Sequence, residues 1–127
     1  MTTAAANNVD VRVRTRFVTE RSDPARGLYL YAYDVTITNR GNTTWQLLTR
    51  HWIITDAFGN VEEVKGPGVV GETPVLEAGQ SFRYTSFCPL KTPVGSMQGS
   101  YQMVNRSGER FDAPIPAFTL ARAGEIN

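Results

Sequence analysis

Residues 9–20 read "VDVRVRTRFVTE", and the alternation in this stretch decides the fold class. One face carries apolar residues and a threonine, at Val9, Val11, Val13, Thr15 and Phe17. The other face carries charges, at Asp10, Arg12, Arg14 and Arg16. A period of two is typical of a β-strand with one buried and one solvated face. The arginines also suggest phosphate binding, but a solvated strand face explains their spacing without a ligand.

Later segments repeat the strand signal, and turn residues separate them. The segments are "LYLYAYDVTITN" (28–39), "TWQLLTRHWIITD" (44–56), "QSFRYTSFCPL" (80–90), "GSMQGSYQMVN" (95–105) and "RFDAPIPAFTL" (110–120). No window shows helical periodicity. We therefore predict an all-β protein, an antiparallel β-sandwich of about seven strands, immunoglobulin-like or fibronectin type III-like. An eight-stranded barrel is the alternative. Trp45 and Trp52 are expected between the sheets.

The bulk properties favour one domain and exclude several partners. A chain of 127 residues suits a single domain, which we place at 9–120 between flexible tails at 1–8 and 121–127. The formal net charge of +1 favours neither nucleic acid nor an anionic membrane as a partner. Because there is one cysteine, no secretory signal and no long apolar run, we predict a cytoplasmic protein without membrane insertion.

A glycine-rich stretch is the strongest candidate for a functional site. Gly66, Gly68 and Gly71 form a G-x-G-x-x-G string, the fingerprint of dinucleotide-binding proteins. That fingerprint requires a following helix, yet residues 72–82, "ETPVLEAGQSF", contain proline and glycine. We interpret the stretch as a tight binding loop with Val69 and Val70 at its base. The loop residues are Gly66, Pro67, Gly68, Val69, Val70, Gly71, Glu72 and Pro74.

An anion site in this loop is the alternative hypothesis. Consecutive amides from Gly68 to Gly71 could hold a pyrophosphate or nucleotide without a helix, with Lys65 or a nearby arginine as counter-charge.

Other reactive residues give weaker signals. The only histidine, His51, is expected to be structural, and Cys88 to be a small buried hydrophobe. Glu62, Glu63 and Glu72 could help to hold a divalent cation, but solvated charges on an exposed hairpin explain them better. We predict no catalytic residue, no metal site and no cofactor. Five tyrosines and six phenylalanines exceed what a small sandwich must bury, which predicts exposed aromatic side chains on a recognition surface.

Three motifs within residues 33–120 resemble the ApaG family of small bacterial proteins, whose domain also occurs in larger eukaryotic proteins. The motifs are G-x-G-V-V-G-x-x-P (66–74), W-x-I-x-D (52–56) and G-x-M-x-G-x-Y-x-M (95–103). The resemblance implies a fibronectin type III-like or immunoglobulin-like sandwich and no established enzymatic activity. It also implies a genetic association with cobalt resistance and magnesium efflux, in which a chain without a membrane span acts indirectly. We predict a non-enzymatic binding module with an unknown protein partner.

Overall fold

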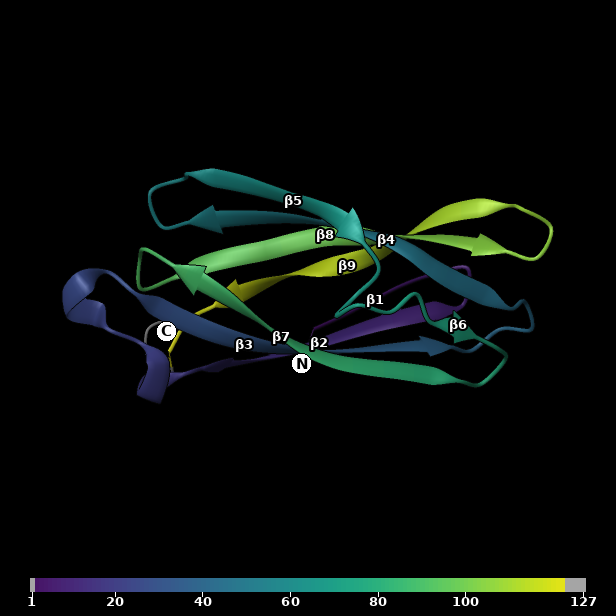
Figure 1. Ribbon diagram of the computed structural model, residues 1–127, viewed down its shortest axis with the longest axis horizontal. Coiled ribbons are helices and arrows are strands. Elements are labelled where there is room, and N and C mark those ends of the chain that lie inside the picture. The colour runs from purple at the N-terminus through teal and green to yellow at the C-terminus, as the bar shows by residue number, and fades with distance from the viewer. Residues whose placement is uncertain (1, 123–127) are drawn as a thin grey trace.

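Two antiparallel sheets pack face to face in the computed structural model, which describes residues 2–122 (Figure 1). One sheet has the order β1 (Thr2–Ala6), β2 (Val9–Phe17), β3 (Tyr29–Asn39), β7 (Ser81–Leu90). The other has the order β5 (Val61–Pro67), β4 (Trp45–Asp56), β8 (Gly95–Asn105), β9 (Arg110–Leu120), and β6 (Val75–Leu76) also pairs with β4. Two short 3-10 helices, Thr19–Arg21 and Pro24–Arg26, lie between β2 and β3. The predicted all-β sandwich is confirmed, and the closed barrel is wrong.

Six strands lie where the alternation predicts them, and three were missed. β1, β5 and β6 escape the pattern because short or edge strands bury little of either face. β5 is the clearest case, because five of its seven residues are exposed. Its sequence, "VEEVKGP", is therefore typical of a charged loop. The predicted total of about seven strands is therefore lower than the nine found within residues 2–122.

The predicted N-terminal tail is wrong for residues 2–8. Residues 2–6 form β1, which pairs with β2 so that Ala4 lies opposite Val11. Asn7 and Asn8 make the connecting turn with φ of 48° and 61°, a conformation that asparagine tolerates better than most residues. The threonines and alanines of β1 show no alternation of apolar and polar residues, so the sequence pattern predicts no strand there. In the predicted C-terminal tail, Arg122 lies over the rings of Phe17 and Tyr29; residues 123–127 lie outside the described part.

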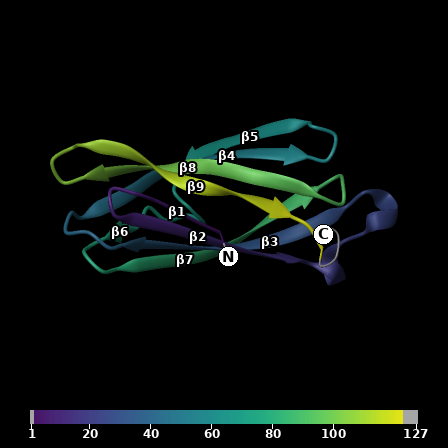
Figure 2. The same ribbon diagram turned by 180° about the vertical axis from the view of Figure 1, so that it is seen from behind.

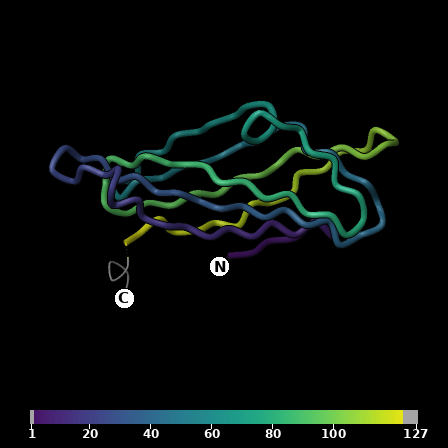
Figure 3. The backbone as a smooth tube through the Cα atoms, turned by 60° about the horizontal axis from the view of Figure 1, so that its bottom comes forward, coloured from purple at the N-terminus to yellow at the C-terminus, as the bar shows by residue number. Residues whose placement is uncertain are grey.

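The two long sides of the sandwich differ. On one side, β1 and β2 run beside β9 and join the two layers (Figures 2 and 3). On the other side, the edge strands β5 and β7 face each other, and no strand within residues 2–122 bridges them. This second side leaves two strand edges available.

The core is an aromatic cluster around Trp52. Its ring centroid lies 5.3 Å from that of Tyr33, 6.0 Å from that of Phe118 and 6.3 Å from that of Tyr101, all edge to face. Such pairs add stability beyond the area that they bury. Trp45 and Trp52 are both buried between the sheets, as predicted.

The expectation of exposed aromatic side chains is met by Phe58 and Phe87 but is wrong for the tyrosines, most of which contribute to this core. The buried ones are Tyr31, Tyr33, Tyr84 and Tyr101. The hydroxyls of Tyr84 and Tyr101 hydrogen-bond to each other, and burial raises the pKa of Tyr101 well above its usual value. The phenols therefore satisfy one another inside the sandwich rather than meeting a partner.

β8 approaches β4 closely at Gly99, which lies opposite Trp52. A Cβ atom at Gly99 would overlap the carbonyl oxygen of His51 and lie 3.2 Å from the Cα of Trp52. The missing side chain is thus what allows β4 and β8 to pair closely at this point.

We expect Gly99→Ala to lower the free energy of unfolding by about 1–3 kcal/mol, because the added methyl group forces two paired strands apart. Urea unfolding followed by tryptophan fluorescence measures the change. Ser96→Ala, on the same strand but clear of this contact, should change it by less than about 0.5 kcal/mol. Equal stability of Gly99→Ala and the wild type would contradict this account of the core.

Candidate functional site

The predicted binding loop is an excursion from the edge of β4. After β5 the chain leaves the sheet, and it returns as β6 to pair with Trp45 and Gln46. Its root is fixed on both sides: the amide of Gly68 donates to the carbonyl of Leu48 at 2.8 Å, and the amide of Leu47 donates to that of Pro74 at 3.0 Å. A bulge in β4 lies between Leu47 and Thr49, where these bonds form. The loop is therefore anchored to the sheet.

The tip of the loop is a tight turn. Val69 and Glu72 exchange two backbone hydrogen bonds of 2.8 and 2.9 Å around Val70 and Gly71. These two central residues have φ of 43° and 82°, and positive values at both positions are those of a type I′ turn. Val69 is only 1% exposed, whereas Val70 is 56% exposed. The interpretation of both valines as the base of the loop is right for Val69 and wrong for Val70.

Gly68 is required by its backbone surroundings, and Gly66 leaves room for the side chain of Arg50. Gly66 lies opposite Arg50, and a Cβ there would come within 2.9 Å of the guanidinium Nη2. The Nη1 of Arg50 donates to the carbonyls of Pro67 and Gly68 at 2.8 and 3.0 Å. Gly68 has a φ of 59°, and a Cβ there would overlap the carbonyl oxygen of Glu72. The glycine spacing thus follows from the architecture of the loop.

The same bonds reduce the capacity of the loop to hold an anion. A nest needs consecutive amides directed at the ligand. The amide of Gly68 already donates to Leu48, and that of Val69 to Glu72. Arg50, the nearest arginine, is directed at loop carbonyls. The geometry therefore argues against a pyrophosphate site formed by the amides from Gly68 to Gly71.

The carboxylates around the loop do not converge. Glu62 and Glu63 are successive residues of β5 and point to opposite faces of the strand. Glu63 Oε1 lies 3.0 Å from His51 Nε2 on the outer face, and Glu72 lies at the turn. Within residues 2–122, no three metal-ligating side chains gather in one place.

Cys88 is buried, as expected, and burial raises the pKa of its thiol to about 12. Because the thiolate is the nucleophilic form, a thiol that stays protonated at neutral pH is a poor nucleophile.

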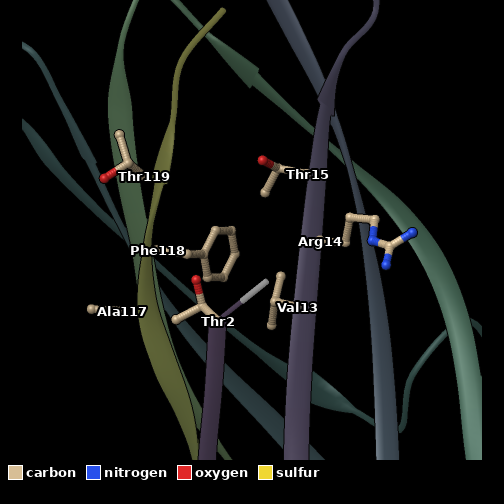
Figure 4. Close-up of a pocket in the computed structure, with 7 residues that line it drawn as sticks. All are labelled: Thr2, Val13, Arg14, Thr15, Ala117, Phe118 and Thr119. Carbon is tan, nitrogen blue, oxygen red and sulfur yellow. The ribbon is translucent and has the colours of Figure 1, made fainter. Parts of the chain in front are cut away.

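Two hollows in the surface give further context. One, of about 600 Å³, lies on the outer face beside the loop and is lined by Thr49, Arg50, His51, Lys65, Gly66, Pro67 and Gln102. The other, of about 380 Å³, lies between β2 and β9, and Figure 4 shows Phe118 pointing into it and Arg14 pointing away. The second hollow offers mainly threonine hydroxyls and an apolar ring, so it has no charged group directed at a ligand.

Comparisons with known proteins agree with one another. A family model described as the ApaG domain matches residues 19–105. A protein from Acidithiobacillus ferrooxidans named Protein ApaG is 56% identical over 115 residues, 91% of each chain. Another of that name, from Anaeromyxobacter dehalogenans, is 51% identical over the full length of both chains.

A solved structure of the same kind supports the fold. The crystal structure of a protein from Bordetella pertussis, described as a putative ApaA protein, is 48% identical with a TM-score of 0.89, covering 91% of this chain and 94% of that one. In residues 2–122, no helix has the length and apolar character needed to cross a membrane.

We expect Val70→Asn to raise the free energy of unfolding by about 1 kcal/mol, because asparagine before glycine suits a type I′ turn and a β-branched residue does not. Urea unfolding measures the change. Val75→Asn is the matched control, since Val75 is also exposed but lies in β6, where no gain is expected. A loss of stability in Val70→Asn would mean that the turn is not strained.

Proposed function

The chain belongs to the ApaG domain family, and from that premise we propose that it is a non-enzymatic module that binds another protein through the tip of the loop at 66–74. The contact surface in this proposal consists of Val70, Gly71, Glu72 and Val75, which we call the loop face. In the same proposal the protein is cytoplasmic, and its link to cobalt resistance and magnesium efflux is indirect, through its partner.

The observation that carries the proposal is the conformation of Val70. A β-branched residue at a φ of 43° is uncommon, and such strain is found preferentially at functional positions. Val70 and Val75 are also 56% and 51% exposed, so two apolar side chains stand in solvent on one short segment. The anchoring bonds at Gly68 and Pro74 hold this segment in place, which lowers the entropy lost on binding.

The described side chains support a non-enzymatic role. His51 is paired with Glu63 on an outer sheet face, and the thiol of Cys88 is buried and protonated. A nucleophile and a base within hydrogen-bond reach are what covalent catalysis requires. These residues do not form such a pair.

Photo-crosslinking in living cells tests the loop face. We expect a photoreactive residue at position 72 to capture one main partner, and Val70→Asn in the same chain to reduce that capture at least about fivefold. The same residue at position 119, exposed on β9, is the control. Mass spectrometry identifies the partner, and its binding is then measured with purified proteins. Equal capture from positions 72 and 119, or no effect of Val70→Asn, would reject the loop face.

The alternative function, binding of a small anion or nucleotide by the loop, has its own test. We expect no saturating amide shifts at residues 66–72 in an NMR titration with ATP, GTP or pyrophosphate, with or without magnesium. The reason is that the amides of Gly68 and Val69 are already bonded. Saturating shifts confined to this segment would favour the anion site over the protein partner.

A further inference from the structure

The open side of the sandwich contains a cleft between β5 and β7. The strand register turns Arg50, Trp52 and Ile54 of β4 towards the interior, and their partners on β5 are Gly66, Val64 and Glu62. The facing wall is formed by Tyr33, Ser86 and Cys88. These groups line a hollow of about 230 Å³, which we call the edge cleft; its full lining is Tyr33, Arg50, Trp52, Ile54, Glu62, Val64, Ser86, Phe87, Cys88, Pro89 and Met97.

The edge cleft has opposite charges towards its two ends and an apolar floor. Arg50 lies at the end near the loop, and Glu62 lies four residues before Gly66 along β5, about 13 Å away at the rise of a strand. Trp52, Val64 and Met97 lie on the floor. Between the charges, Tyr33 hydrogen-bonds with Ser86, and burial raises the pKa of its hydroxyl, which therefore stays neutral.

Both charges have bonding capacity left. Arg50 makes its two hydrogen bonds through Nη1, and within residues 2–122 its Nε and Nη2 donate to no other group. Glu62 forms no ion pair with any described residue. Inward-facing positions farther along β4 and β8 carry apolar side chains instead, such as Leu47 and Met103. The charge pattern is thus a local property of the cleft.

β5 itself offers the other half of a binding site. It pairs with β4 on one side only, so its second edge is open along the upper border of the molecule in Figure 1. An open strand edge can accept an extended segment through main-chain hydrogen bonds, and side chains at alternate positions then enter the adjacent pockets. The charges on β5 discourage indiscriminate pairing and favour a segment with complementary charges.

We propose that the edge cleft binds an extended peptide segment of a partner protein, added as a strand to β5. One acidic side chain of the segment lies at Arg50, an apolar side chain two positions on covers Val64, and a basic side chain two positions further lies at Glu62. In antiparallel addition, the commoner arrangement, the order of the segment's residues from its N-terminus is acidic, any, apolar, any, basic. This surface is separate from the loop face, so either proposal can fail without the other.

Fluorescence anisotropy with labelled seven-residue peptides tests the inference. One peptide carries Asp, Val and Lys at alternate positions among threonines, and the second carries Asp, Val and Asp. We expect the wild type to prefer the first peptide. In Glu62→Lys the first peptide should bind about tenfold more weakly, and the preference should reverse in favour of the second.

Glu63→Lys is the matched control, because the neighbouring residue points to the opposite face of β5. It should change neither affinity by more than about twofold. Val70→Asn should also leave peptide binding intact, which separates the edge cleft from the loop face. The inference is overturned if the wild type binds neither peptide at millimolar concentration, or if Glu62→Lys and Glu63→Lys have the same effect.

Discussion

The hydrogen bonds of Arg50 to the chain beyond Gly66 are the interaction on which the open edge of the sandwich depends. Gly66 leaves the space beside it to the guanidinium, whose Nη1 donates to the carbonyls of Pro67 and Gly68. Those bonds fix where β5 ends and the loop begins. They also place a cation at the end of the edge cleft. One cross-strand pair therefore sets both the turn that presents Val70 and the charge pattern between β5 and β7.

The sequence predicts the interior better than the edges. Alternation predicts the start of β2 and both ends of β3 to within one residue, because one face of each strand is buried, but it extends β2 three residues too far. It missed β1 and β5, whose side chains are small or exposed on both faces, so a period of two carried no hydrophobic signal. The excess of tyrosine was interpreted as a surface feature because composition does not reveal that hydroxyls such as those of Tyr84 and Tyr101 satisfy each other.

The glycine stretch shows how far a motif can be interpreted. Its proline and the lack of a following helix were sufficient to reject a dinucleotide fold and to predict a tight loop. The sequence does not predict why each glycine is present, because Arg50 lies sixteen positions before Gly66 and contacts it only through strand pairing. The edge cleft cannot be predicted from the sequence for the same reason. Its walls come from β3, β4, β5 and β7, which are far apart in the sequence. In the sequence alone, Glu62 is indistinguishable from any other solvated carboxylate.

The strand order also has a consequence for how the protein folds. β3 pairs with β7, so that Tyr29 meets Leu90, and β4 pairs with β8, so that Trp45 meets Asn105. Pairings across some sixty residues make folding slow relative to helical domains, in the range of milliseconds to seconds. Because the edge cleft needs strands from both sheets, a chain leaving the ribosome acquires it only when nearly all of its strands have been synthesised. Recognition of a partner at this cleft would then report that the whole domain has folded.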